Sequence, residues 1–259
     1  MILHQPKRVV KRAMMEEDKS TFTRDFMCGR FRQTRSQKQL EERFQAEGDV
    51  DVAPRFNIAP TQPVITVRQK KDELARRFSM MRWGLIPSWA KDLSIGNTTV
   101  NARSETVTTT LSFSEAIQSR RCLIPADGFY EWKKMGRIRQ PYCFEVGEGE
   151  LFALAGLWDE WKNPTGEIIQ SCTVLTTTPN TLLANIHDRM PVIVSPDKYG
   201  LWLNPEVQDF ADVRKIFKPY DPSLMRSYPV NLKLNNVQND DADSAAPIVL
   251  KFPLQADLF

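Results

Sequence analysis

The segment Met27 to Phe31, with the sequence MCGRF, places a cysteine directly after a methionine. A chain that began at Cys28 would present a free α-amine and a thiol on adjacent carbons, which is a 1,2-aminothiol. The amine of such a pair condenses with an aldehyde to form an imine, and the thiolate then closes a five-membered thiazolidine ring. Near neutral pH both groups are partly deprotonated, because their reference pKa values are about 8 and about 8.5. A Cys-Gly pair taken alone is more often a buried cysteine beside a turn, so the assignment depends on the rest of the chain.

Three downstream stretches also carry residues suited to chemistry or binding. In GFYEW, Gly128 to Trp132, large aromatic residues surround an acid, and NARSE lies in the polar stretch from Ser94 to Thr110. Such polar loops in compact domains often carry function. The stretch RWGLIPSW contains Trp83 and Trp89, which are more often packing residues than platforms for stacked bases, and both interpretations stay open.

Composition excludes several classes of protein. A chain of 259 residues can bury one full core, and its net charge of +3 does not by itself indicate a nucleic-acid binder. Four cysteines and two histidines are too widely spaced for a metal site. No signal peptide and no membrane-spanning run are recognisable, so we expect a cytoplasmic protein with reduced thiols.

The elements that must position these residues follow from local patterns. After the capping hydroxyls of Thr34 and Ser36, a short helix is expected in which Leu40 and Phe44 lie one turn apart. Strands are expected at 64–67, 142–146, 151–157, 171–176 and 192–194. Further short helices are expected at 113–120, 179–186, 199–203 and 206–217.

Six motifs occur in the order MCGRF, NIAP, RWGLIPSW, NARSE, GFYEW and HDRMP. Together they resemble the SRAP domain, the SOS response-associated family of abasic-site processing proteins, from Cys28 to about Asn239. The resemblance implies an α+β fold with a β-barrel-like core of mainly antiparallel strands and peripheral short helices. It also implies a positively charged channel for single-stranded DNA and covalent capture of abasic sites. No cofactor, no metal and no membrane contact are expected, and the expected form is a monomer.

The resemblance assigns roles to four candidate catalytic residues. Cys28 would be the nucleophile, and the carboxamide of Asn101 would orient its amine or the imine. An abasic sugar is mostly a closed hemiacetal, so Glu131 would open the ring by general acid-base catalysis. Its aromatic neighbours should partly desolvate it and raise its pKa toward neutrality. His187 would be a second proton-handling group or a donor to the adjacent phosphate.

The resemblance also suggests which residues contact DNA. Guanidinium groups form fork-like contacts with phosphates, and the NIAP loop is expected to form part of a wedge that splits the strand at the lesion. The candidate DNA-binding residues are Arg30, Asn57, Pro60, Arg82, Trp83, Arg103 and Arg189.

The 26 residues before Met27 depart from the family pattern, in which the reactive cysteine follows the initiator methionine. We expect residues 1–26 to be a disordered extension or a mis-assigned start, residues 28–239 to form the domain, and residues 240–259 to form a tail. Translation from Met27, or removal of the extension by an autopeptidase activity, would expose the Cys28 amine. Without either event this copy would be inactive.

The resemblance therefore implies a DNA-repair enzyme of the SOS response with lyase-like chemistry, which binds single-stranded DNA and crosslinks abasic sites through Cys28. Two alternatives remain. The first is a cysteine peptidase that uses Cys28 and His187. The second is a noncovalent module for single-stranded DNA that relies on the arginine and aromatic residues alone.

Overall fold

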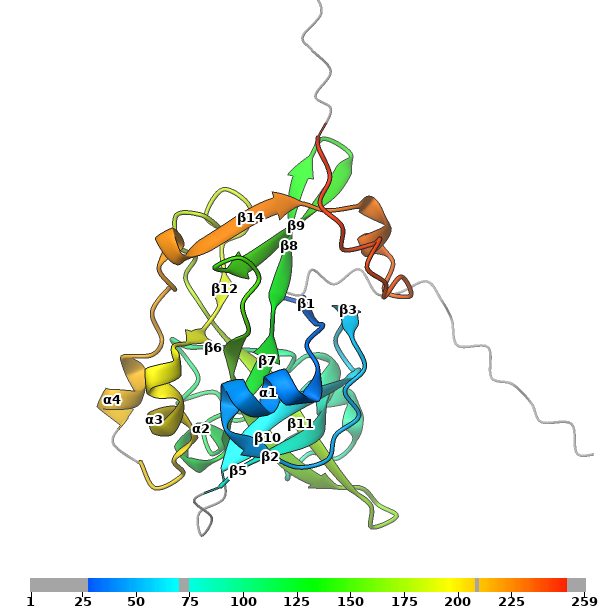
Figure 1. Ribbon diagram of the computed structural model, residues 1–259. Helices are drawn as coiled ribbons and strands as arrows, with labels where there is room; N and C mark the ends of the chain where they lie inside the picture. The colour runs from blue at the N-terminus through cyan, green and yellow to red at the C-terminus, as the bar shows by residue number, and fades with distance from the viewer. Residues whose placement is uncertain (1–27, 70–74, 208–209, 251–259) are drawn as a thin grey trace, which may run out of the picture.

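Two β-sheets form the framework of the protein in a computed structural model that describes residues 28–69, 75–207 and 210–250 (Figure 1). The strands are β1 Arg30–Gln33, β2 Ala46–Glu47, β3 Arg55–Ile58, β4 Pro63–Gln69, β5 Arg76–Trp83, β6 Asn101–Arg103, β7 Arg121–Ala126, β8 Gly128–Met135, β9 Ile138–Val146, β10 Phe152–Lys162, β11 Ile168–Thr177, β12 Met190–Pro191, β13 Ile193–Val194 and β14 Met225–Pro229. The α-helices are α1 Gln37–Phe44, α2 Ala116–Ser119, α3 Tyr199–Leu203 and α4 Phe210–Arg214. The 3-10 helices are η1 Leu93–Asn97, η2 Pro196–Lys198, η3 Pro222–Leu224 and η4 Leu232–Asn235. The predicted extension, residues 1–26, lies outside the described residues.

Five strands of the larger sheet close into a barrel. Strand β10 pairs antiparallel with β11 and with β7, and β4 pairs antiparallel with β7 and with β5. A parallel pairing of β5 with β11 closes the ring. The short helices lie outside this barrel (Figure 1). The fold is thus α+β, with a barrel core of mainly antiparallel strands, as the sequence predicts.

Barrel strands are buried on both faces because alternate residues enter two different cores. On β7, Leu123 packs in a cluster with residues of α1 and α3, whereas Cys122 and Ile124 pack in a second cluster. The second cluster includes Phe129 and Phe144 of the smaller sheet. Side chains alternate along a strand, so one strand can join both cores. The barrel therefore fixes the smaller sheet on one side and the helices on the other.

The smaller sheet has the strand order β14-β9-β8-β1-β3 and is antiparallel throughout. Strand β1 lies inside this sheet, between β8 and β3, with Arg30 opposite Tyr130 and Phe31 opposite Ile58. Hydrogen bonds on both edges hold its register. Cys28 lies two residues before β1 begins at Arg30, so this pairing decides where the candidate nucleophile lies.

Most of the expected elements are confirmed, and two expected helices are not. The expected strands correspond to β4, β9, β10, β11 and β13, and Ser36 caps α1 in a capping box with Gln39. The region 179–186 forms turns, because Asn180 Oδ1 accepts from the backbone of Leu183 and its Nδ2 donates to Tyr220 O. An asparagine that bonds the backbone in this way competes with a helix. In the region 206–217 the helix α4 spans only Phe210–Arg214.

The packed structure continues beyond residue 240, where the sequence predicts a tail. Ile248 N donates to Pro229 O at 2.9 Å, Val230 bridges to Pro247, and Ala245 is buried. The side chain of Asp240 accepts hydrogen bonds from Phe56 N and Asn57 N. Residues 240–250 therefore belong to the folded domain.

Gly84 offers a test of this architecture, because it lies where the chain leaves β5 with φ at +122°. A Cβ atom there would lie 2.2 Å from the carbonyl oxygen of Gly96 and 2.7 Å from Arg82 Nη1. We expect Gly84→Ala to lower the free energy of unfolding by at least about 2 kcal/mol, measured by chemical denaturation. The control is Gly136→Ala, where φ is +61° and no atom lies within 4 Å of the added carbon, which should cost about 1 kcal/mol. An equal loss in both variants would contradict the close approach of Gly84 to Gly96.

Candidate active site

Cys28 lies at the entrance of β1 and is 5% exposed. Its backbone nitrogen donates a hydrogen bond of 2.8 Å to Oε1 of Glu131, a residue 103 positions away in the chain. Its φ of +48° lies in the left-handed region, which residues with a side chain rarely adopt. Such strain persists only where the surroundings hold the residue firmly, and it concentrates at functional sites.

Glu131, on β8, is 2% exposed and has an unusual acidity for a carboxyl group. Burial raises its pKa from the usual 4.5 to about 8, although hydrogen bonds from the side chain and backbone of Cys28 act in the opposite direction. The aromatic neighbours of Glu131 in the sequence predict a shift in this direction. Near neutral pH the group can therefore both give and take a proton.

The thiol of Cys28 is less acidic than that of a free cysteine. Burial raises its pKa, the nearby carboxylate of Glu131 raises it further, and the charge of Arg189 lowers it in part. The expectation of a usable thiolate fraction concerns a chain that begins at Cys28, whereas this raised pKa belongs to Cys28 inside the 259-residue chain. Sulfur attack at this position therefore needs a partner that removes the proton, and Glu131 lies beside it.

His187 completes a line of proton-handling groups. Its Nε2 lies 3.9 Å from Glu131 Oε2, and its side chain is 22% exposed. The other ring nitrogen, Nδ1, accepts from the backbone N–H of Arg189 at 3.1 Å and lies 3.2 Å from a carboxylate oxygen of Asp188. Nδ1 also lies 3.3 Å from Arg189 O, so Arg189 and Asp188 surround this nitrogen and Nε2 is the ring nitrogen that faces Glu131.

Arg189 joins the NARSE and HDRMP segments. Its two terminal nitrogens bind both carboxylate oxygens of Glu105 at 2.6 and 2.9 Å, and one of them also donates to Thr176 O at 2.8 Å. The side chain is buried, and a fork-to-fork ion pair of this kind fixes geometry as well as charge. This position does not fit the prediction that Arg189 contacts phosphate, because its charge is already compensated and enclosed. Arg189 instead fixes the backbone that holds His187.

Asn101 and Arg103 lie at the two ends of the short strand β6, which pairs in parallel with β11. Asn101 is half-buried opposite Val174, and Arg103 is exposed opposite Thr176. Thr176 is also opposite Pro191 of β12. Strands β6 and β12 thus bring the NARSE and HDRMP segments to the same end of β11.

Arg30 and Arg82 are half-buried, and neither has a carboxylate partner within 4 Å among residues 28–69, 75–207 and 210–250. Arg30 donates to Asn57 Oδ1 at 2.6 Å and to Leu234 O at 3.1 Å, while Arg82 donates to Asn97 Oδ1 and Gly84 O. Burial lowers the pKa of Arg30 to about 10 and also lowers that of Arg82. Both guanidinium groups hold a positive charge that the neighbouring acceptors orient but do not neutralise.

The remaining predicted DNA contacts occupy different environments. Trp83 is fully buried and its Nε1 donates to Val100 O, so no ring face is available to a base, and the prediction that it contacts DNA does not fit this position. Asn57 is also fully buried, which does not fit a role at the tip of a wedge. Pro60 is half-buried in the turn after β3, and Trp89 is 46% exposed.

Sequence reasoning missed a buried ionic cluster beneath the site. Arg32 of β1 pairs with Asp127 and with Glu145, and both carboxylates are almost inaccessible. The absence of a side chain at Gly128 leaves space for the Arg32 guanidinium, since a Cβ atom there would lie 2.9 Å from Arg32 Nε. The cluster fastens β1 to β8 and β9. The glycine that begins GFYEW was the only signal in the sequence, and no spacing rule connects it to Arg32.

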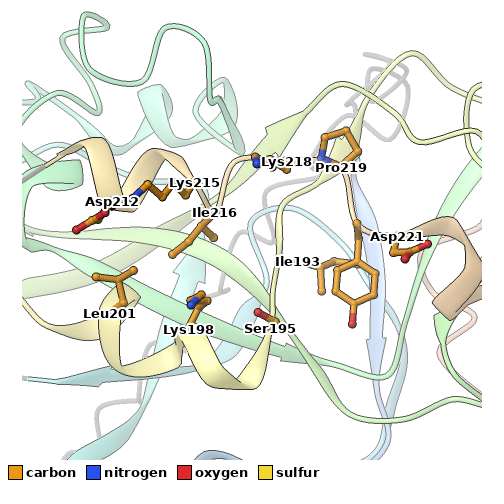
Figure 2. A pocket seen from close by; sticks show the side chains of 11 residues that line it. Ile193, Ser195, Lys198, Leu201, Asp212, Lys215, Ile216, Lys218, Pro219 and Asp221 are labelled. Atoms are coloured by element: carbon orange, nitrogen blue, oxygen red, sulfur yellow. Dashed lines mark hydrogen bonds and ion pairs between the residues drawn. The ribbon is translucent and has the colours of Figure 1, made fainter.

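Other features of the described residues lie away from this centre. No three potential metal-ligating side chains converge among them, and none of their helices is long and apolar enough to cross a membrane. A cavity of about 470 Å³ lies between η2, α4 and the segment from Lys218 to Asp221 (Figure 2). Its rim carries Lys198 and Lys215, which pair with Asp197 and Asp212. None of the predicted site residues lines it.

The sequence and the fold both have known relatives. The family model described as SOS response associated peptidase (SRAP) matches residues 27–237. The abasic site processing protein YoqW of Bacillus subtilis is 38% identical over 221 residues, which cover 84% of this chain and 98% of YoqW. The abasic site processing protein HMCES of Xenopus tropicalis is 31% identical over 79% of this chain and 69% of its own length. A crystal structure of a protein from Bacteroides thetaiotaomicron, 25% identical, superposes with a TM-score of 0.78 over 86% of this chain and all of that one.

The raised pKa of Glu131 gives a prediction for stability. In the unfolded chain this carboxyl loses its proton near pH 4.5, whereas in the folded protein it keeps the proton until about pH 8. The stability that the group contributes is therefore fully present below pH 4.5 and is lost as the pH rises through about 8. We expect the full chain to lose up to about 1.4 kcal/mol per pH unit in this window relative to Glu131→Gln, whose side chain does not titrate.

The measurement is chemical denaturation of both proteins between pH 5 and about 8. Glu150→Gln, at an exposed position, controls for the loss of a carboxylate as such. A difference between the wild type and Glu131→Gln that stays constant with pH would contradict the raised pKa.

Proposed function

Since the chain belongs to the SOS response associated peptidase (SRAP) family, we propose that it processes abasic sites in DNA, as the names of its relatives say of them. In this proposal Cys28 becomes the first residue and captures the aldehyde of the lesion in single-stranded DNA as a thiazolidine. One observation carries the proposal, the 2.8 Å hydrogen bond between the Cys28 nitrogen and the Glu131 carboxylate. This bond holds the Cys28 nitrogen, which must react with the aldehyde, next to Glu131, which must transfer protons.

The chemistry balances without a cofactor or an oxidant. Protonated Glu131 gives its proton to the ring oxygen of the sugar and takes up the proton that the anomeric hydroxyl loses, which opens the hemiacetal to the aldehyde and returns Glu131 to its protonated form. The Cys28 amine adds to the aldehyde carbon, and loss of one water molecule gives the imine. The thiol then adds across the C=N bond, with sulfur bonding to carbon and the proton passing to nitrogen. Glu131 begins as an acid, ends the cycle ready to act again, and is assisted by His187 at 3.9 Å.

The backbone at Cys28 supports the idea that this residue becomes N-terminal. Its φ of +48° is the torsion about the N–Cα bond, and it is unfavourable because it brings the side chain close to the carbonyl group of the preceding residue. A free amine has no preceding carbonyl, so the steric conflict that makes this region unfavourable disappears.

The charge distribution supports binding of a DNA backbone next to this centre. Arg30 is two residues from Cys28, and within the described part of the chain its guanidinium contacts neutral acceptors and the ring of Trp132. A phosphate would supply the missing counter-charge for Arg30, and another would do so for Arg82. In the same proposal Asn101 orients the Cys28 amine, and the exposed Arg103 contacts the strand.

A cysteine peptidase would need a thiolate activated by histidine. Here His187 Nε2 lies 3.9 Å from a carboxylate oxygen of Glu131, and the pKa of the Cys28 thiol is raised. These observations favour aldehyde capture over general peptidase activity.

The proposal predicts that covalent capture depends on the position of Cys28 in the chain. A chain that begins at Met27 and is processed to Cys28 should give a shifted band with abasic DNA on a denaturing gel, whereas the intact 259-residue chain should not. In the shorter chain, Cys28→Ala should abolish the band, and Cys122→Ala, at another buried cysteine, should retain it. Capture by the intact long chain at the rate of the short one would overturn the aminothiol mechanism.

The proposal also predicts a salt dependence for one arginine. Arg82→Gln should weaken binding to intact and abasic single strands alike and reduce the slope of log affinity against log salt by about 0.7, the value for one phosphate contact. The matched control is Arg226→Gln, because the exposed Arg226 is already paired with Glu145 at 2.6 Å and should leave the slope unchanged. An unchanged slope for Arg82→Gln would exclude a phosphate contact at this residue.

A further inference from the structure

The segment Leu234 to Asp240 is anchored in part by one fully buried side-chain amide, that of Asn57. Asn57 Nδ2 lies within hydrogen-bond distance of three carbonyl oxygens of this segment, Leu234 O at 3.1 Å, Asn236 O at 3.1 Å and Asn239 O at 2.9 Å. The other side of the same amide, Oδ1, accepts from Arg30 Nη1 at 2.6 Å. Asn57 therefore connects the C-terminal segment to the strand that follows Cys28.

The end of this segment is tied to β3 as well. Asp240 Oδ1 accepts from the backbone N–H groups of Phe56 and Asn57, and its other oxygen pairs with Arg55. A carboxylate that accepts several backbone hydrogen bonds and one ion pair is strongly oriented. The segment thus has a fixed attachment at each of its two ends.

The same segment reaches both strands that carry the reacting groups. Arg30, on β1, donates to Leu234 O and lies 5.6 Å from the ring centre of Trp132. Trp132, next to Glu131 on β8, donates from Nε1 to Asn235 Oδ1 at 2.7 Å. The segment Leu234 to Asp240 therefore contacts both Arg30, which is two residues from Cys28, and Trp132, which is next to Glu131. In Figure 1 the C-terminal segment, in orange and red, lies near the ends of β3 and β8.

We propose that Leu234 to Asp240, fastened through Asn57 and Asp240, is a positioning clasp that holds the Cys28 nitrogen in register with Glu131 and orients Arg30 toward the DNA backbone. The clasp touches no substrate in this proposal, and it acts through Arg30 and Trp132. A neutral amide is suited to its centre, because an acidic residue at position 57 would neutralise Arg30. The inference rests on the proposed capture reaction, which it deepens by assigning the elements that set its geometry.

The test compares Asn57→Ala and Asp240→Asn with the control Asp243→Asn, in chains processed to Cys28. Asp243 pairs with Lys233 at the surface of the same region, so its loss should not affect the clasp. We expect capture of abasic strands at saturating concentration to slow by at least about tenfold in Asn57→Ala, because small misplacements of a nucleophile are costly. Asp240→Asn should also slow capture, but by less than Asn57→Ala. Asp243→Asn should capture abasic strands at the wild-type rate.

The pH profile separates positioning from general stability. A loosened clasp admits water to Glu131, which lowers its pKa toward the usual 4.5, so the midpoint of the capture profile should move to lower pH. A loss of capture that only follows the unfolded fraction, with an unchanged midpoint, would overturn the proposal. If Asn57→Ala does not fold, Asp240→Asn decides the question by the same readout.

A second readout does not depend on DNA. The rate at which iodoacetamide alkylates Cys28, followed by mass spectrometry of its peptide, should rise in Asn57→Ala, because Cys28 is only 5% exposed in the clasped structure. If the wild-type protein forms no adduct with DNA, the proposed function is refuted, but the alkylation rates of Cys28 still test the clasp. Equal alkylation rates in Asn57→Ala and the wild type would refute the clasp.

Discussion

The structure depends on a buried hydrogen bond between a backbone nitrogen and a carboxyl group. Cys28 and Glu131 are 103 residues apart, and both are almost inaccessible to water. To bring them within 2.8 Å, β1 must lie between β8 and β3, and the smaller sheet must pack on the barrel. The burial that this packing produces is also the cause of the raised pKa of Glu131. Position and reactivity thus have one physical origin.

Buried and half-buried arginines of the fold fall into three groups, which differ in how their positive charge is compensated. Arg32 and Arg189 are paired with carboxylates and fasten strands or segments. Arg121 donates to backbone carbonyls around α2 and α3 and is enclosed. Arg30 and Arg82 have neutral acceptors and remain half-buried, which leaves their charge for an anion. Burial together with the identity of the acceptors separates candidate phosphate contacts from structural guanidinium groups.

The sequence predicts the fold class, most strands and the capped helix, and it singles out Glu131 as the candidate acid. The aromatic neighbours of Glu131 predict a desolvated carboxyl, and burial of the group agrees with that expectation. The turns at 179–186 were missed, since the side chain of Asn180 bonds to Tyr220 O, 40 residues away. For the same reason the sequence does not reveal that Asn57 and Trp83 are fully buried or that Arg189 pairs with Glu105. A motif letter shows the residue type, but only long-range packing shows whether its polar atoms are already engaged.

The most direct measurement is tandem mass spectrometry of the adduct formed between an abasic strand and the protein, after digestion of both. The aminothiol account predicts modification of an N-terminal Cys28, with the mass of the aldehyde fragment added and one water molecule lost. It also predicts that the adduct resists borohydride, because the ring contains no C=N bond. An adduct on a lysine or on another cysteine, or one on Cys28 that retains a preceding residue, would contradict the account.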